Sequence, residues 1–356
     1  MNESDILHLR LANQQIAGTK LESPRDLVRW LGAIQAQDFR SALWSVGLRL
    51  PGSTSADIDR AIRNRQIVRA WALRGTIHLV AAEDVRWLAT LTGPRAASKS
   101  ARACRQAGLT DADLRKAFTL LEKGLRQEGE LTRQQIGSIW ESAGVATDNQ
   151  RGYLMLSRAG HEGRICFGPM KDKQQTFVLL NEWVRKEAAF TREESLTELA
   201  TRYFTSHGPA TVDDFAWWCG CTLTDVRRAI GRIMPRLSST NAAGRDYLYV
   251  AKRGPILPKR TVYLLPGFDE YMLGYTDRSF LIAAAHRHHI YPANAVYPGV
   301  IISDGRIKGI WRSDSRRTGK VDALSLFTTL SYRVGREMRM AYAAHNQFWT
   351  SHGTAY

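Results

Sequence analysis

The feature that most constrains the fold is a recurring order of elements, in which stretches of helical period are followed by two short strand-like runs. The middle copy is the clearest. From Leu114 to Leu125 apolar residues recur at spacings of three and four, which predicts a helix over 111–127. Thr132 can cap a second helix, and Gln135 stands three residues later, as a capping box requires.

The middle copy closes with a third helix and a hairpin. Asp148 or Asn149 is expected to open the third helix. Two strands, 164–168 and 176–180, then flank a turn at 169–173. Three helices followed by a β-hairpin are the elements of a winged helix.

The same order recurs on both sides of the middle copy, without an obvious sequence repeat. After the middle copy we predict a helix at 195–206, a second at 211–218 that Thr211 caps, and a third that Thr222 or Thr224 opens and that ends at 235. Strands are predicted at 236–240 and 247–250. Before it we predict helices at 4–16, 24–34, 39–50, 56–64 and 82–91, and strands at 67–70 and 76–80.

The last part of the chain differs from these copies. Residues 262–265, 300–303 and 307–311 are strand-like, Asp304 and Gly305 form a hairpin turn, and 324–339 looks helical. We therefore predict an α+β fold, mainly α. Its expected domains are three tandem winged helices at 1–110, 111–185 and 186–258, and a β-rich basic domain at 259–356.

The charge balance points to a polyanionic partner. Fifty Lys and Arg against 34 Asp and Glu leave a net charge of +16 and a pI near 10.0. Half of that excess falls in residues 251–356. Nucleic acid or an anionic membrane surface suits such a charge, and a solvated basic face without a ligand is the alternative. No apolar run approaches the roughly 18 residues of a membrane span, so we expect no membrane partner.

Cysteine and histidine spacing argues against a metal. The four cysteines form no CxxC pair, and residues 1–10 show no secretory signal, so we expect a cytoplasmic protein. His286, His288 and His289 have no carboxylate or thiol placed nearby, which favours a basic loop over phosphate rather than a metal site. The lack of P-loop, GxSxG and HExxH motifs disfavours nucleotide-driven motors, α/β-hydrolases and zincins.

The most informative tract is LGAIQAQDF, which contains Gln35, Ala36 and Gln37. In a continuous helix the two glutamines would lie about 200° apart, whereas locally extended chain puts them on the same side. Asp38 is a good N-cap for a helix over 39–50, so the tract looks like a helix junction where both amides could converge. The alternative is two polar residues that cap or bridge helices, and spacing alone favours that alternative.

Three segments carry a resemblance to a known family: RAWALRGTIHLV from Arg69, LLPGFDEYMLGYTDR from Leu264 and VIISDGRIKGIWR from Val300. In this order, and spread along nearly the whole chain, they resemble the winged-helix DNA glycosylases of the AlkZ and YcaQ type. The resemblance implies three winged helices packed as a C around a basic channel, with a β-rich C-terminal part.

The resemblance also implies a chemistry. The family's catalytic signature is Gln-apolar-Gln in one branch and Gln-apolar-Asp in the other, so Gln35 and Gln37 are expected to be catalytic in the AlkZ-like manner. Members of that branch excise bulky N7-alkylguanine from DNA, and some unhook interstrand crosslinks. The branch is associated with self-resistance to DNA-alkylating antibiotics. Ala36 is smaller than the aliphatic residue often found there.

The expected enzyme is a monofunctional DNA glycosylase. Because no lysine lies in the tract, we expect hydrolysis without a Schiff base and without a cofactor or metal. The expected partner is double-stranded DNA with alkylated guanine, and the protein is expected to act as a nucleoid-associated monomer.

Seven residues are predicted to bind DNA: Arg74, His78, Arg287, His288, Arg312, Arg316 and Arg317. Arg74 and His78 are expected to line the channel beside the glutamines, and a histidine buried in the core is the alternative for His78. Two other functions stay open. A winged-helix transcription regulator would need the charge but no catalytic pair, and a structural module of a protein complex would leave the charge unexplained.

Overall fold

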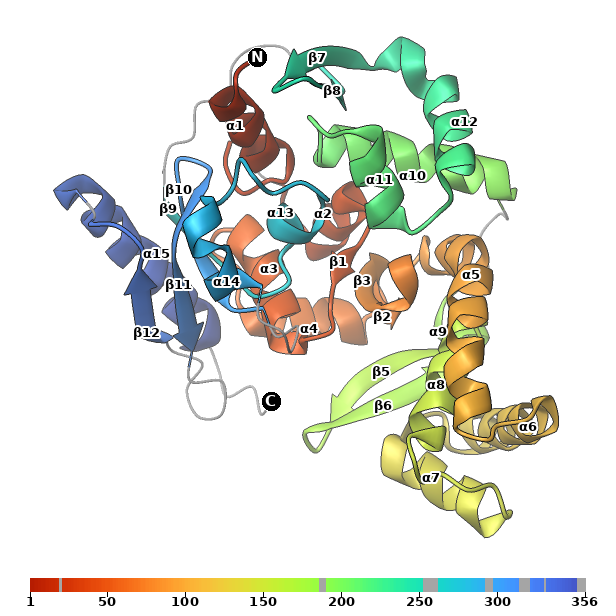
Figure 1. The fold of residues 1–356 in the computed structure, drawn as a ribbon. Helices are drawn as coiled ribbons and strands as arrows, with labels where there is room; N and C mark the ends of the chain where they lie inside the picture. Colours follow the sequence, from red (N-terminus) through yellow and green to blue (C-terminus); the bar gives the residue numbers. More distant parts are fainter. Residues whose placement is uncertain are drawn as a thin grey trace. The chain divides into compact units, whose positions relative to one another are not determined.

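The computed structural model describes residues 1–18, 21–185, 190–251, 262–291, 297–313, 321–329 and 331–350. The chain forms two compact units, shown in Figure 1. Unit 1 combines Met1–Ile58 with Leu196–Thr354, and unit 2 is Asp59–Ser195. Both units mix helices with strands and helices predominate, so the expectation of an α+β, mainly α fold is confirmed.

Unit 1 begins with helices that are capped by side chains. Its first elements are α1 (Glu3–Asn13), α2 (Pro24–Leu31), the short strand β1 (Ile34–Gln35) and α3 (Phe39–Arg49), followed by α4 (Ser55–Arg63). Asn2, Ser23 and Asp38 each accept a hydrogen bond from a backbone N–H of the first turn of the helix that follows. The predicted cap at Asp38 is therefore confirmed.

The next part of unit 1 has three helices and a hairpin, in the predicted order. They are α10 (Arg192–Ser206), α11 (Val212–Cys219), α12 (Leu223–Ile233), the one-turn helix η2 (Met234–Arg236), β7 (Ser238–Ala242) and β8 (Arg245–Tyr249). Thr211 caps α11 in a capping box, and Thr222 caps α12. The hairpin turns at Ala243 and Gly244, both with positive φ.

A four-stranded antiparallel sheet completes unit 1, in the order β12-β11-β10-β9. Its strands are β9 (Val262–Leu265), β10 (Gly299–Ser303), β11 (Arg306–Ser313) and β12 (Val321–Leu326). The predicted turn at Asp304 and Gly305 is confirmed, because both residues have positive φ between β10 and β11. The short helices α13 (Glu270–Leu273), η3 (Ala284–His286) and α14 (Arg287–Ile290) lie between β9 and β10 in sequence.

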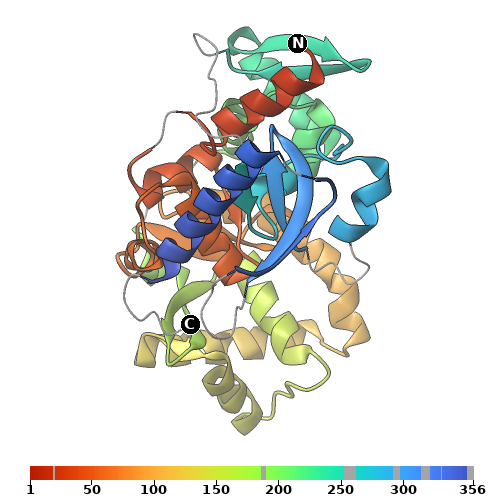
Figure 2. The same cartoon turned by 90° about the vertical axis from the view of Figure 1, so that its left-hand side faces the viewer.

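The helix predicted at 324–339 is wrong in its first part. Leu324 and Leu326 belong to β12, where they pair with Trp311 and Gly309 of β11, and the helix α15 spans Tyr332–Thr350. Strand pairing with the edge of the sheet decides the conformation here, because the apolar pattern of so short a segment suits either structure. Figure 2 gives a second view of α15, which packs against β9 and α3.

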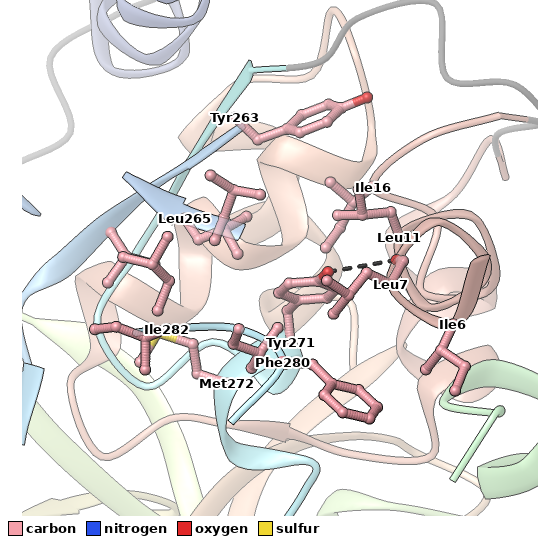
Figure 3. Close-up of a cluster of buried hydrophobic side chains, with 14 of the residues drawn as sticks. Ile6, Leu7, Leu11, Ile16, Tyr263, Leu265, Tyr271, Met272, Phe280 and Ile282 are labelled. Carbon is pink, nitrogen blue, oxygen red and sulfur yellow. Dashed lines mark hydrogen bonds between the residues drawn. The ribbon is translucent and has the colours of Figure 1, made fainter. Parts of the chain in front are cut away.

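The core of unit 1 joins segments that are far apart in sequence. Leu7 and Leu11 of α1 pack with Leu265 of β9 and with Tyr271, all of them fully buried or nearly so (Figure 3). The Tyr271 hydroxyl also donates to the carbonyl of Gly305 at 2.9 Å, which ties α13 to the β10–β11 turn. The N-terminal helix and the C-terminal sheet therefore stabilise each other.

Unit 2 has strands in the order β3-β2-β5-β6-β4, with helices around them (Figure 1). In chain order its elements are β2 (Ile67–Trp71), the one-turn helix η1 (Leu73–Gly75), β3 (Ile77–Ala81), α5 (Val85–Gln106), α6 (Asp111–Glu128), β4 (Leu131–Thr132), α7 (Arg133–Ser142), α8 (Arg151–His161), β5 (Ile165–Lys171), β6 (Gln174–Leu179) and α9 (Leu180–Trp183). The predicted helix at 111–127 and the Thr132–Gln135 capping box are confirmed.

Three predicted boundaries in unit 2 are wrong. The α8 helix begins at Arg151 rather than at 148 or 149, because Asn149 and Gln150 take positive φ. The β5 strand continues to Lys171, beyond the predicted turn at 169. The α5 helix continues through Pro94 to Gln106, far past the predicted end at 91, and packs along α8. Tertiary packing therefore overrides the helix-ending tendency of proline.

Candidate active site

The glutamine tract is an extended link between two helices of unit 1. The α2 helix ends at Leu31 because Gly32 has a φ of 81°, and a Cβ there would lie 3.3 Å from the Trp218 ring. This ends the helix three residues before the predicted boundary at 34. The chain then runs extended through Gln35.

The link is buried up to Ala36 and becomes exposed at Gln37. Ile34 and Ala36 are fully buried, Gln35 is buried with 9% of its surface exposed, and Gln37 is exposed. The extended chain at a helix junction is present as predicted, because β1 lies between α2 and α3. Convergence of the two amides on one point stays a prediction.

A buried carboxylate holds the backbone of the tract. Glu270 Oε1 accepts a hydrogen bond from the backbone N–H of Gln35 at 2.8 Å, and Glu270 Oε2 accepts one from Trp218 Nε1 at 2.8 Å. Glu270 and Trp218 are fully buried. Since a buried charge is costly unless it is hydrogen-bonded, these contacts set the position of Gln35.

His207 is packed beside this carboxylate. Its Nε2 lies 3.6 Å from Glu270 Oε2, and its ring stacks on Tyr203 at a centroid distance of 4.8 Å. Burial lowers the pKa of His207, although the nearby Glu270 opposes that shift. The Gln35 N–H and the Trp218 indole are therefore the hydrogen-bond donors that stabilise the Glu270 carboxylate.

The neighbouring carboxylate holds the helix that follows the tract. Asp269 accepts two hydrogen bonds from the Arg49 guanidinium of α3, at 2.8 and 2.9 Å, and a third from the Ser45 hydroxyl at 2.8 Å. Arg49 also donates to the backbone and side-chain oxygens of Gln14. Asp269 and Glu270 therefore fasten α3 and β1, the elements on either side of Gln37.

Sequence reasoning did not single out Asp269 and Glu270 as site residues. They lie in the segment LLPGFDEYMLGYTDR, which supported the family resemblance. The signal that could have found them is a pair of adjacent acids inside an otherwise apolar run, because acids in a buried segment need partners.

Arg74 and His78 belong to unit 2, with Arg74 on the connection between β2 and β3 and His78 in β3. Arg74 has a φ of 59°, and Gly75 follows it at the turn, as predicted. His78 is fully buried in β3, and its Nδ1 lies 3.0 Å from the carbonyl oxygen of Thr76. Their position beside the glutamines, which belong to unit 1, stays a prediction.

The other predicted DNA-binding residues lie in the C-terminal part of unit 1. Arg287 and His288 are exposed on α14, and Arg312 is exposed near the end of β11. Arg316 and Arg317 lie outside the described residues. Within the described ranges, no three or more His, Cys, Asp or Glu side chains form a group that could hold a metal ion. Among the helices in those ranges, none is long and apolar enough to cross a membrane.

Comparisons with known proteins agree with the resemblance read from the sequence. The family described as DNA glycosylase AlkZ-like matches residues 28–348. An interstrand DNA cross-link repair glycosylase of Streptomyces sahachiroi is 24% identical over 322 residues, which cover 85% of each chain. The solved structure of Streptomyces sahachiroi DNA glycosylase AlkZ has a TM-score of 0.81 at 20% identity, covering 98% of this chain and 96% of that chain.

Proposed function

Because the chain belongs to the AlkZ-like DNA glycosylase family, we propose that it hydrolyses the N-glycosidic bond of bulky N7-alkylguanine in DNA, with Gln35 and Gln37 placing the attacking water. The chain is a DNA glycosylase, and DNA is its substrate. The observation that carries the proposal is the extended Gln-Ala-Gln link, whose backbone a buried carboxylate holds.

Two neutral amides suit an alkylated base. N7-alkylation puts a positive charge on guanine, so the C1′–N9 bond can break with its electron pair moving to the base and neutralising that charge. Water then bonds to C1′ and releases a proton to solvent. The oxocarbenium-like sugar poses the same electronic problem as in sugar hydrolases. Glutamine is a weak base, but its carbonyl and N–H groups can orient water.

Neutral side chains also favour damaged over undamaged guanine. An unmodified guanine leaves as an anion unless an acid protonates it, and an amide is not such an acid. In this mechanism Glu270 is a positioning residue, because its carboxylate is engaged by Trp218 and by the Gln35 backbone N–H. The charge of Glu270 therefore orients the tract rather than touching the sugar.

The substrate is proposed to include crosslinked DNA. The relative in Streptomyces sahachiroi is named for interstrand cross-link repair, which supports unhooking by this chain. We also propose a role in self-resistance to a DNA-alkylating antibiotic, as the family resemblance implies. For the fold we propose three winged helices in a C-shape, with the domains predicted from the sequence. The order of three helices and a hairpin in α6–β6 and again in α10–β8 supports this.

DNA binding is proposed to use the predicted basic residues Arg74, Arg287, His288 and Arg312, whereas His78 is fully buried and is not proposed to touch DNA. Three of these side chains are exposed in unit 1, which supports their access to a phosphate backbone. We further propose that the protein acts as a nucleoid-associated monomer in the cytoplasm.

The test uses duplex DNA with a defined N7-guanine adduct, and measures release of the free modified base under single-turnover conditions. Gln35→Ala and Gln37→Ala should each slow release by about 10²-fold or more while duplex binding stays close to wild type. Gln127→Ala, at an exposed position of α6, is the matched control. Wild-type rates in both single variants would refute the assignment of the pair.

A second arm uses a duplex with an interstrand crosslink, followed on a denaturing gel. Separation of the strands would support crosslink unhooking. Release from monoadducts without strand separation would restrict the substrate to single-strand adducts. No release from any N7-adduct would reject the proposed reaction as a whole.

A further inference from the structure

The α5 helix of unit 2 carries positive charge without any negative charge. Its 22 residues include five cations and no Asp or Glu: Arg86, Arg95, Lys99, Arg102 and Arg105. The neighbouring helix α6 balances four cations with four acids over 18 residues. The one-sided charge of α5 is therefore a property of that helix and not of unit 2 in general.

Three of these cations form a row on the exposed face of α5. At 100° per residue, Arg95, Lys99 and Arg102 point within about 60° of one another, and they span roughly 10 Å along the axis. All three are exposed. On the other side of the helix Ala96 and Ala97 are buried, so packing fixes which face the row presents.

The row is not used for ion pairs within the described structure. By contrast, Arg86 at the start of the helix donates to the Asn181 side chain and to the Val184 carbonyl. Among the described residues, no Asp or Glu lies within ion-pair distance of Arg95, Lys99 or Arg102. Like charges at spacings of three and four weaken a helix, and an anionic ligand would remove that repulsion.

The row begins next to the turn that carries Arg74. A Cβ on Gly75 would lie 3.1 Å from the Ala96 Cβ, and the Thr92 hydroxyl donates to the Ala72 carbonyl at 3.2 Å. His161 of α8 lies against the same turn, with its Nε2 3.1 Å from the Gly75 carbonyl oxygen. These contacts join the Arg74 turn to the start of the row, so both belong to one packed part of unit 2.

We propose that Arg95, Lys99 and Arg102 of α5 bind successive phosphates of a DNA duplex. The proposal rests on the proposed function, since it adds a contact with the DNA phosphate backbone to a DNA glycosylase. Three successive phosphates of one strand rise by about 7 Å along the duplex axis, which is within the span of a row of about 10 Å that carries long, flexible side chains. Contacts of this type are independent of base sequence, which suits an enzyme whose target is a lesion.

The experiment compares two triple variants of the full chain. The first carries Arg95→Gln, Lys99→Gln and Arg102→Gln on α5. The matched control carries Arg115→Gln, Lys123→Gln and Arg126→Gln on α6, which are also exposed in unit 2. Both remove three positive charges, so a mere effect of net charge would appear equally in both. Affinity for an undamaged duplex is measured by fluorescence anisotropy between about 50 and 200 mM salt.

The α5 variant should show a slope of log K against log salt that is shallower by about 2 to 3, since each phosphate contact contributes about 0.9. The α6 variant should keep nearly the wild-type slope. A charge-conserving variant, Arg95→Lys with Arg102→Lys, should also keep nearly the wild-type slope of log K against log salt. If far-UV circular dichroism shows that the α5 triple variant is unfolded, Lys99→Gln alone should change the slope by about 1.

Equal slopes in the α5 and α6 variants would overturn the proposal. An unchanged affinity in the α5 variant would assign the row to another partner, such as an acidic protein, and would overturn it as well. The proposed function fails on a separate measurement, because the slope is measured on undamaged DNA and base release on adducts. A wild type that binds with a steep slope but releases no base would refute the reaction and leave the row supported.

Discussion

The candidate site in unit 1 and the α5 helix of unit 2 differ in how their charged residues are buried and paired. In unit 1, Asp269, Glu270 and Arg49 are fully buried, and each is hydrogen-bonded to a named partner at 2.8 to 2.9 Å. In unit 2, Arg95 and Lys99 are exposed, and no carboxylate of the described residues lies within ion-pair reach of them. Buried charges with fixed partners hold geometry, whereas exposed charges without partners remain available to a ligand.

The difference separates two requirements of a DNA glycosylase. Chemistry on one sugar needs side chains placed to a fraction of an ångström, and satisfied buried charges provide that rigidity at a desolvation cost. Binding of a DNA phosphate backbone depends on long-range electrostatic attraction, which tolerates movement of the protein side chains. The variants below are expected to separate the positioning of side chains at the sugar from the electrostatic attraction to DNA phosphates.

The largest expected effect is on stability, at Asp269. Asp269→Asn removes the charge that pairs with Arg49 and leaves a buried guanidinium uncompensated, so the free energy of unfolding should fall by about 3–5 kcal/mol. Urea denaturation followed by tryptophan fluorescence measures the change. A loss below about 1 kcal/mol would mean that this pair is as weak as an exposed one, and the contrast between the units would disappear.

The next effect is on catalysis, at Glu270. In Glu270→Gln the amide cannot accept from both the Gln35 N–H and the Trp218 indole, so the tract should shift and base release should slow by about 10²-fold. Duplex affinity should remain close to wild type. The measurement is single-turnover release at a temperature where the variant is folded.

Asp269→Asn is the control for Glu270→Gln, because it makes the same change in the adjacent carboxylate without removing an acceptor from Gln35. Rate losses of equal size in the two variants would point to a general loss of structure in unit 1. A larger loss in Glu270→Gln would assign positioning of the tract to Glu270.

A third effect concerns pH. Burial lowers the pKa of His345 to about 4, while an unfolded histidine titrates near 6.5. The unfolded state therefore takes up a proton first as the pH falls, and stability is lost from about pH 6.5 downward, by about 2 kcal/mol at pH 5. Urea midpoints from pH 8 to 5 measure the loss.

His345→Gln should flatten that profile, because a glutamine does not titrate and can still accept from the Trp349 indole, which donates to His345 Nε2 at 3.1 Å. A residual loss of stability toward low pH is expected from His207, since burial lowers its pKa as well. An unchanged pH profile in His345→Gln would show that His345 does not carry the acid sensitivity of unit 1.

The smallest expected effect is at the surface of unit 2. Arg126 pairs with Glu122 at 3.3 Å but remains 59% exposed, so Arg126→Gln should change the free energy of unfolding by less than about 0.5 kcal/mol. The same urea assay applies. A loss of several kcal/mol in the free energy of unfolding would mean that an exposed ion pair stabilises the protein as much as a buried one.

Local chemistry made much of the fold predictable. The caps at Asp38, Thr132 and Thr211 were expected from residue type and spacing, because a side-chain oxygen satisfies the free N–H groups of the first turn wherever the helix lies. For α12 the structure selects Thr222 from the two candidates, Thr222 and Thr224. The turn at Asp304 was expected for a similar reason. These features depend on a few consecutive residues.

The two largest errors lie where distant segments decide the conformation. Leu324 forms a strand because β11 pairs with it, and α5 continues through Pro94 because α8 packs along it. The candidate site divides in the same way. The tract with Gln35 and Gln37 was found from its sequence and the family resemblance, whereas the carboxylate that holds it comes from residue 270.

The sequence by itself determined the helix caps, the hairpin turns, the excess of positive charge and the Gln-Ala-Gln tract. Each of these depends on residue type within a few positions, or on composition. Only the tertiary structure decided that Glu270 accepts from the backbone of Gln35 and that the cations of α5 form one exposed row. The physical reason is that partners for buried charge, and the exposed face of a helix, are set by packing between segments far apart in the chain.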